Sequence, residues 1–325
     1  MPSNLVQYDP INVSIPRELA PAGATPAQRR AYPDYASSNT DRMDLMRFIG
    51  YSNSNQLQTE VKRNFSRGLV LQGFYTFQKT LTTSEGANNS YGGVEIVPAA
   101  LSNNASTAQR LRAVYAPDSG LPRHNFSING NYELPFGQGK AFLSSSNGFV
   151  NRIVSGWNAS GFYYWRSGLP FSPYYCNTIT LSANSNRSCP IVLAPGKNGI
   201  LPADQRQAAR WFDASIQRAD LGQPYTGQTF IQRANPLDYD FLNNIPRNYM
   251  TGPGFFNIDA SFYKVTPITE RVKLRLETQI FNLLNHKNFG LPNNLGFINT
   301  GVAGANGTNT VGLARLVQFQ GRIDF

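Results

Sequence analysis

The side chains best suited to catalysis or metal binding are scarce in this chain of 325 residues. It has two histidines, His124 and His286, and two cysteines, Cys176 and Cys189, and these form no close cluster with aspartates. A structural zinc ion takes four Cys or His ligands at short spacing, and no glycine-rich phosphate-binding motif is present. The sequence therefore predicts neither a metal ion nor a cofactor.

His124 and Ser127 are the residue types of a hydrolase pair, and they lie close together in the sequence. Residues three apart on a strand point to opposite faces, so these two side chains cannot meet directly. We therefore expect a protein that is not an enzyme.

Cys176 and Cys189 lie in the longest predicted loop. A disulfide between them would close a short loop and stabilise the fold by roughly 3 kcal/mol on the chain-entropy model. An oxidising compartment permits such a bond. We expect the disulfide, with two free thiols as the alternative.

The formal net charge of +10 raises the question of nucleic-acid binding. Such proteins gather their basic residues on one face. Here Lys and Arg are scattered through turns and loops, and the densest groups, Lys62-Arg63 and 271–275, lie inside alternating segments. We expect no nucleic-acid partner, and basic residues at strand ends could instead meet lipid phosphates.

Seven segments alternate apolar and polar residues, which indicates β-strands with one apolar face. The third segment is the clearest, with Phe126 and Ile128 set between Asn and Ser residues. The fourth is less regular, because its polar face also carries Phe162 and Tyr164. The predicted strands lie near residues 52–64, 69–80, 123–136, 157–168, 255–265, 271–284 and 313–325.

The connections between these segments alternate in length. Short links follow the first and fifth segments, a medium one follows the third, and long ones follow the second, fourth and sixth. A transmembrane barrel has short periplasmic turns and longer extracellular loops. The pattern predicts an all-β fold, an antiparallel up-and-down transmembrane β-barrel. The alternative is a secreted β-sandwich that serves as an adhesin or ligand-binding module.

In the barrel interpretation, residues 1–51 are the end of a preceding strand and an extracellular loop, and residues 52–325 are the C-terminal part of the barrel. No apolar run of about 18 residues could form a transmembrane helix, and no signal peptide is visible. Seven strands would leave unpaired edges in hydrocarbon, and bacterial single-chain barrels have an even number of strands. We therefore expect an incomplete sequence or pairing with another chain.

Four motifs occur in order along the chain: SNSNQLQ, RNFSRGL and YTFQK within 52–79; RHNF and YELPFG within 123–137; GPGFFNID at 252–259; and FNLLNHKNF at 281–289. This ordered set resembles the Oar-like TonB-dependent receptors of acidobacteria, over roughly residues 4–325. The resemblance implies a barrel of about 22 strands filled by a plug, in the outer membrane of a Gram-negative bacterium.

The same resemblance implies uptake of a large, unidentified nutrient with energy supplied by TonB. The signal peptide, the TonB box, the plug and most of the barrel have no counterpart here, so Met1 would be an internal start or the start of a truncated gene. TonB and the plug would then be partners only through the missing N-terminal part. Outer-membrane lipid and the barrel-assembly machinery are the remaining expected partners, and the fragment alone is not expected to transport.

The last predicted strand ends on Phe325. It resembles the signal read by the barrel-assembly machinery, which favours a terminal aromatic residue after alternating apolar residues. Phe319, Ile323 and Phe325 fit that signal, whereas Gly321 lies one residue away from the usual glycine position. The alternative is that any β protein can end in Phe.

Arg210, Trp211 and Phe212 lie in the longest predicted loop and are candidates to cap the barrel mouth or to contact a ligand. Charged residues on the polar face would contact water or the plug, but we expect them mainly to pair with charges on neighbouring strands. These residues are Glu60, Glu133, Asp259, Arg275, Glu277, Arg322 and Asp324.

Overall fold

The structure is a computed structural model. It describes residues 5–10, 21–25, 28–35, 44–65, 68–83, 94–95, 105–145, 147–172, 191–207, 210–218, 222–232, 245–292 and 310–325. In these ranges the α-helices are α1 (Thr107–Val114) and α2 (Gly148–Val154), with short 3-10 turns at Pro33–Tyr35 and Ala203–Gln205. Neither α-helix has the length and apolar character needed to cross a membrane, and no other described helix does.

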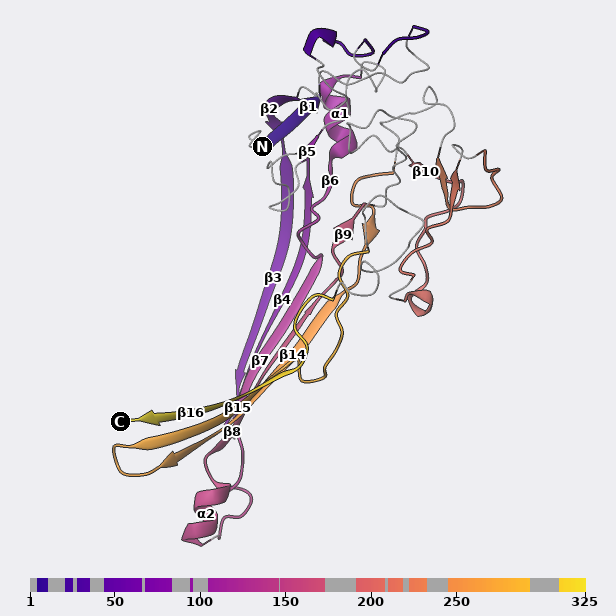
Figure 1. The fold of residues 1–325 in the computed structure, drawn as a ribbon. Helices are drawn as coiled ribbons and strands as arrows, with labels where there is room; N and C mark the ends of the chain where they lie inside the picture. Colours follow the sequence, from indigo (N-terminus) through magenta and orange to yellow (C-terminus); the bar gives the residue numbers. More distant parts are fainter. Residues whose placement is uncertain are drawn as a thin grey trace.

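A long twisted antiparallel sheet forms the body of the molecule (Figure 1). Seven of its strands lie side by side in chain order, and the two-residue β6 (Ala116–Pro117) pairs with the end of β4. Each of the seven predicted segments corresponds to one of these strands, with ends that differ by at most three residues. The strands are β3 (Ser52–Asn64), β4 (Leu69–Thr82), β7 (His124–Glu133), β8 (Trp157–Arg166), β14 (Phe255–Pro267), β15 (Lys273–Phe281) and β16 (Leu316–Asp324).

The register of the strands collects their apolar residues on one face. Tyr75 on β4 is opposite Phe126 on β7, which is opposite Trp165 on β8, which is opposite Phe256 on β14. Because side chains alternate between faces along each strand, this pairing aligns the apolar positions of all seven strands. The sheet therefore has one continuous apolar face and one mainly polar face.

The connections separate by length between the two ends of the sheet. The links 65–68, 134–156 and 268–272 lie at one end of the sheet, where β16 also ends. We call this end the short-connection end. The links 83–123, 167–254 and 282–315 lie at the other, the loop end. Figure 1 shows α2 and the C-terminus at the first end and β1, β2, α1 and β10 at the second.

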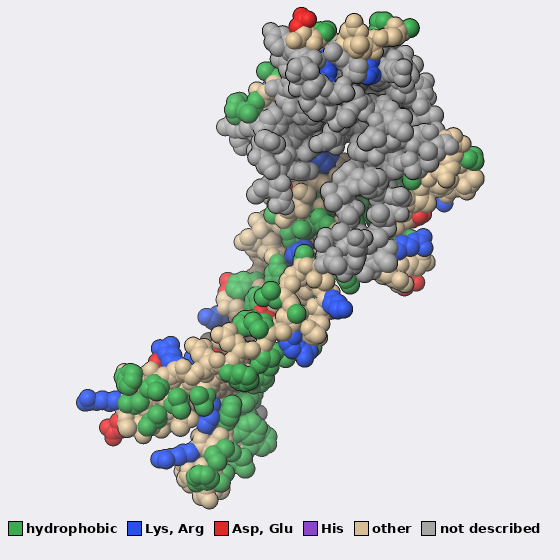
Figure 2. All heavy atoms as spheres, in the orientation of Figure 1, with side chains coloured by type: hydrophobic (Ala, Val, Ile, Leu, Met, Phe, Trp, Pro, Cys, Tyr) green, Lys and Arg blue, Asp and Glu red, His purple; other side chains and the backbone are tan. Residues whose placement is uncertain are grey.

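The apolar face of the sheet is not covered by other described parts of the protein. Phe262, Leu276 and Phe319 on this face are 44%, 53% and 79% exposed. Figure 2 shows hydrophobic side chains gathered on the surface of the lower part of the sheet and near α2. Among the described residues, the buried hydrophobic clusters lie at the loop end instead. The sheet thus presents its apolar side outward.

A small second sheet lies at the loop end. β1 (Leu5–Pro10) runs antiparallel to β2 (Asp44–Gly50) and parallel to β5 (Val94–Glu95). β2 continues into β3 after the single residue Tyr51. β2 therefore extends β3, and β1 is antiparallel to this extension, as the next strand of an antiparallel sheet would be.

The longest connection forms a compact unit, here called the loop module, which comprises β9 and the described residues from 191 to 251. Its short strands are β9 (Pro170–Phe171), β10 (Ile191–Leu193), β11 (Ile216–Arg218), β12 (Phe230–Gln232) and β13 (Met250–Thr251). β12 lies between β10 and β11, and β13 pairs with β9. Their buried core contains Phe171, Phe212, Ile216, Phe230 and Met250.

Both edges of the main sheet are unpaired along their length within the described residues. β3 pairs with β4 alone, and β16 pairs with β15 alone. The seven strands accordingly form an open wall in which the first and last strands do not meet.

Candidate functional site

The polar face of the sheet is an extended surface on which this protein could contact a polar solute. Rows of amide and hydroxyl side chains cross it, such as Asn131, Ser160 and Ser261, which are opposite one another on β7, β8 and β14. At the β3 side, Gln72 Nε2 donates a 2.7 Å hydrogen bond to Glu60 Oε1. Such a face can hydrogen-bond to water or to sugar and peptide groups, since it presents both donors and acceptors.

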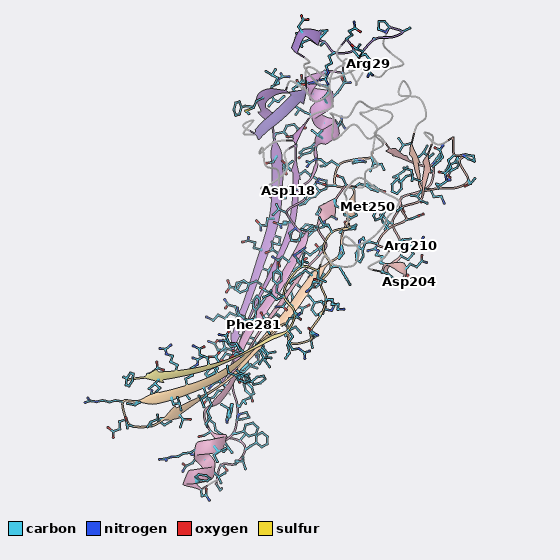
Figure 3. All side chains as sticks on the ribbon, in the orientation of Figure 1. Arg29, Asp118, Asp204, Arg210, Met250 and Phe281 are labelled. Atoms are coloured by element: carbon cyan, nitrogen blue, oxygen red, sulfur yellow. The ribbon has the colours of Figure 1, made fainter. Side chains whose placement is uncertain are left out.

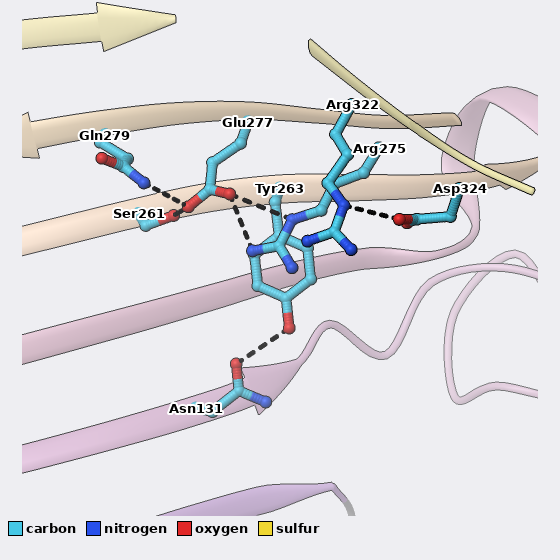
Figure 4. A network of polar contacts seen from close by, with 8 residues as sticks. All are labelled: Asn131, Ser261, Tyr263, Arg275, Glu277, Gln279, Arg322 and Asp324. Atoms are coloured by element: carbon cyan, nitrogen blue, oxygen red, sulfur yellow. Dashed lines mark hydrogen bonds and ion pairs between the residues drawn. The ribbon is translucent and has the colours of Figure 1, made fainter. Parts of the chain in front are cut away.

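Glu277 is the centre of a polar network on this face (Figure 4). Its side chain is 8% exposed and accepts hydrogen bonds from Ser261 Oγ at 2.6 Å and Gln279 Nε2 at 3.0 Å. Arg275 Nε and Nη2 lie 3.0 and 2.7 Å from Glu277 Oε2. The guanidinium of Arg275 also lies 4.1 Å from the centre of the Tyr263 ring. The network holds Arg275 flat against the wall.

Two charge pairs on this face run along a strand, whereas sequence reasoning placed them across strands. Arg275 pairs with Glu277 on β15, and Arg322 Nε lies 2.6 Å from Asp324 Oδ1 on β16. Residues two apart on a strand share a face, and the long arginine side chain reaches its own-strand neighbour. The expectation of cross-strand ion pairs was therefore wrong for these two arginines.

Two other predicted charged residues of the polar face, Asp259 and Glu133, have different partners. Asp259 Oδ1 accepts from Asn257 Nδ2 at 2.7 Å and from the backbone N–H of Asn282 at 2.8 Å. Glu133 pairs with Lys140 of the following turn at 2.8 Å. Asp259 therefore binds groups of β14 and of the chain after β15, and Glu133 binds the turn after β7.

Aromatic residues occupy the same face nearer the loop end. The rings of Phe162 and Tyr164 on β8 stack with centroids 6.4 Å apart and planes inclined by 14°. Tyr164 also packs edge-on against Phe255, with ring centroids 5.9 Å apart. Arg166 lies 5.5 Å over the Phe255 ring. Stacked rings beside a cation can bind the flat faces of sugars or other rings. The irregular alternation at Phe162 and Tyr164 was the only sequence signal for this cluster.

The two histidines contact aromatic side chains. His124 Nδ1 is 2.8 Å from the Tyr75 hydroxyl on the apolar side, while Ser127 lies on the polar face opposite Tyr164. The His286 ring packs on Phe256 with centroids 4.0 Å apart. In the part of the chain that the structure describes, no three His, Cys, Asp or Glu residues are grouped to hold a metal ion.

A sequence model of the outer membrane beta barrel domain family matches residues 2–318. The chain belongs to this family. A domain of this kind lies in the outer membrane, so the uncovered apolar face of the sheet is its lipid-facing surface. The prediction of an all-β antiparallel barrel domain in that membrane is confirmed.

A comparison with curated protein sequences finds no match. Among solved structures, the outer membrane transporter YddB from Escherichia coli is similar, with a TM-score of 0.43 and 9% sequence identity. The match covers 99% of this chain and 28% of that transporter. This barrel domain thus spans less than a third of the transporter's length.

The loop module of the barrel domain contains the three predicted ligand contacts. Phe212 is 6% exposed and packs edge-on against Phe230 with ring centroids 6.4 Å apart. Trp211 Nε1 donates a 2.8 Å hydrogen bond to Thr251 O, and Arg210 is exposed (Figure 3). Phe212 therefore belongs to the core of the module, whereas Arg210 is exposed and Trp211 partly exposed, and a ligand contact by these residues stays a prediction.

Asp213 shapes the turn that carries these residues. It accepts hydrogen bonds from the Thr229 hydroxyl and, at 3.1 Å, from the backbone N–H of Ser215. Desolvation raises the pKa of Asp213, but the hydrogen bonds from Thr229 and Ser215 and the positive charge of Arg210 outweigh it, so the pKa lies below its ordinary value. The ionised carboxylate therefore joins the residues that precede β11 to the residue that precedes β12.

Two residues of the loop module attach it to the end of the sheet. Arg247 Nη2 donates to Thr82 O at 2.6 Å and its Nε to Val114 O at 3.1 Å. Asn248 Nδ2 donates to Pro117 O at 2.7 Å. Two of the long connections are thereby fixed to each other, so the module is held at one position on the rim.

The predicted assembly signal lies at the last edge of the wall. Phe319 and Ile323 belong to the apolar face, opposite Thr278 and Leu274, and Phe325 is 94% exposed. Recognition of these residues by the assembly machinery stays a prediction. Cys176 and Cys189 lie outside the described residues, so the predicted disulfide also stays a prediction.

Proposed function

We propose that this domain is the C-terminal wall of a large TonB-dependent uptake barrel, and that its polar face and loop module conduct and contact a large nutrient. The observation that carries the proposal is the edge formed by β3. β1 pairs with β2 at the loop end. From Ser52 to Asn64, the edge of β3 that faces away from β4 has no partner among the described residues. The edge is therefore shaped to receive an additional strand.

Unpaired backbone groups support a wider barrel. Each N–H or C=O left without a partner in hydrocarbon costs several kcal/mol, so a membrane sheet closes on itself or on further strands. β3 and β16 have thirteen and nine residues, respectively, along these edges. Closure against further strands satisfies both edges, and a barrel with many strands encloses a lumen wide enough for a large solute.

The surface chemistry suits a solute that is large and polar. The polar face combines amide rows with the Phe162, Tyr164 and Phe255 rings, and the module places Arg210 and Trp211 at the rim. Sugars and peptides bind to such mixtures of hydrogen-bonding groups and flat rings. The TonB requirement comes from the ordered motifs that resemble Oar-like receptors, including GPGFFNID at 252–259 and FNLLNHKNF at 281–289.

The proposal can be tested by uptake in cells that make the protein from its own locus. Four strains are compared: the parent, a deletion of this gene, a TonB deletion and the double deletion. Each is given an isotope-labelled digest of polysaccharide and protein, and the labelled compounds that enter the periplasm are identified by mass spectrometry. A strain with the gene restored is the control.

We expect at least one large compound to enter the parent and to be lost equally in both single deletions, with no further loss in the double deletion. Equal uptake in the parent and the gene deletion would contradict a role in uptake. Uptake that depends on this gene but persists without TonB would indicate a passive pore and would contradict the energised mechanism.

A further inference from the structure

α2 exposes its apolar side chains at the short-connection end. None of its residues is buried. Phe149 and Ile153 are 76% and 55% exposed, and they are four residues apart, so they share one face of the helix. Phe142 and Leu143 in the preceding turn are 58% and 53% exposed. This apolar surface requires a covering medium that the described protein does not supply.

The exposure is built into a well-fixed element. Asn147 caps the helix by accepting a 2.9 Å hydrogen bond from Val150 N, and Asn151 Oδ1 accepts one of 2.8 Å from Gln138 N. A Cβ on Gly137, whose φ is +111°, would lie 2.6 Å from Ser155 Cβ. A seven-residue helix is marginal alone. These contacts therefore hold α2 in place without burying its apolar face.

The C-terminal turn of α2 is joined to the lipid-facing side of the sheet. Trp157 and Lys264 are opposite each other on that face of β8 and β14. Trp157 Nε1 donates to Ile153 O at 2.9 Å, and Lys264 Nζ donates to Ile153 O at 3.0 Å and also to Ser155 O. Trp and Lys are characteristic of the membrane–water boundary. α2 thus continues the lipid-facing surface beyond the strand ends.

The charge of this segment complements lipid phosphates. Residues 134–156 contain no Asp or Glu and two basic residues, Arg152 and Lys140, of which Lys140 pairs with Glu133 at the end of β7. Arg152 is exposed and has no ion pair with any residue that the structure describes. A short helix with apolar residues on one side and an exposed cation can lie at the boundary between head groups and acyl chains.

From this geometry we propose that α2 and the turn at Phe142 and Leu143 form an interfacial anchor. The anchor lies in the phospholipid leaflet that meets the short-connection end, with Phe149 and Ile153 among the acyl chains and Arg152 near the phosphates. The proposal goes beyond transport and does not depend on it, because it rests on the membrane location and on the contacts of α2.

Photo-crosslinking tests this anchor in cells that produce the full chain. A benzophenone amino acid replaces Phe149, and matched variants carry it instead of Phe262 on the lipid-facing side of β14 or Tyr225 in the loop module. Tyr225 is 48% exposed, so it controls for exposure alone. Cells with radiolabelled phosphate in their lipids are irradiated, and adducts are identified by mass spectrometry.

We expect phospholipid adducts at positions 149 and 262, each several-fold above position 225. Capture at position 149 of a protein, whether another copy of this chain or a component of the assembly machinery, would overturn the proposal. Lipid capture at 149 no greater than at 225 would also overturn it, whatever position 262 captures.

Discussion

Arg110 and Asp9 are 101 residues apart in the chain and form a two-pronged ion pair at the loop end. Arg110 Nη1 lies 2.9 Å from Asp9 Oδ1, and Nη2 lies 2.7 Å from Oδ2. Arg47 Nη1 on β2 adds a third contact at 3.0 Å to Asp9 Oδ2. This carboxylate therefore links β1, β2 and α1, and the side chains of Asp9 and Arg110 are 8% and 4% exposed.

Loss of this pair should open the loop end. In Arg110→Met, the partner that Asp9 keeps among the described residues is the partly exposed Arg47. Removal of one partner of a buried pair costs about 3–5 kcal/mol. We expect proteinase K to cleave within residues 5–50 of the protein in isolated outer membranes much faster than in the parent protein. Arg112→Met, an exposed position on the same helix, should leave the rate unchanged. Equal rates in the two variants would contradict a specific role of the pair.

Glu277→Gln should weaken the wall. The carboxylate accepts from Ser261, Gln279 and Arg275, and hydrogen bonds to a charged group contribute about 1.5–3 kcal/mol. We expect a lower temperature for the mobility shift of the folded barrel in gel electrophoresis. The control Glu60→Gln changes an exposed carboxylate with a hydrogen bond from Gln72 and should have little effect. A larger shift in the control than in Glu277→Gln would count against the network.

The strands of the wall could be predicted from the sequence because their faces have unlike environments. Alternation in 123–136 predicted β7, and the same period placed Phe126 and Ser127 on opposite faces. The arrangement of the strands follows because neighbours in the chain are joined in sequence and their apolar faces must align. Because one face of each strand meets lipid, apolar and polar residues alternate in the sequence, and this alternation allows the strands to be predicted.

The loop module and α2 could not be predicted in the same way. Phe212 and Phe230 meet through a long connection without periodicity, so their burial depends on long-range packing. α2 has fewer than two apolar repeats, which is too short for a helical pattern. The ion-pair partner of Arg275 could not be predicted either, because its side chain could reach Glu277 along β15 or a charge on a neighbouring strand.

The loop module should lose stability in acid through Asp213. Its pKa is lower in the folded protein than in the unfolded chain, so its contribution is complete above the unfolded value, about 4, and is lost as the pH falls through the folded value. We expect the fluorescence of Trp211, taken as the difference from Trp211→Phe, to change below about pH 4. In Asp213→Asn this acid transition should disappear, and an unchanged transition would assign it to another group.

Gly199 should tolerate alanine less well than Gly196. Both glycines have left-handed φ values, +69° and +73°, so each substitution carries a backbone cost of about 1–2 kcal/mol. A Cβ on Gly199 would also lie 2.7 Å from Met250 Cε and 3.1 Å from Phe230 Cζ, whereas one on Gly196 meets nothing within 4 Å. We expect Gly199→Ala to expose the module to proteinase K more than Gly196→Ala. Equal protection would show that the core yields without cost.

The most direct test of the lipid-facing wall compares arginine at two adjacent positions in the middle of β7. Ile128 lies on the apolar face opposite Tyr163, and Asn129 on the polar face opposite Phe162. Arginine on the lipid face near the bilayer midplane costs about 2–4 kcal/mol, whereas a lumen position tolerates it. The measurement is the fraction of each variant that is folded in the outer membrane. The account predicts a strong loss for Ile128→Arg and near-parental levels for Asn129→Arg, and equal or reversed losses would contradict it.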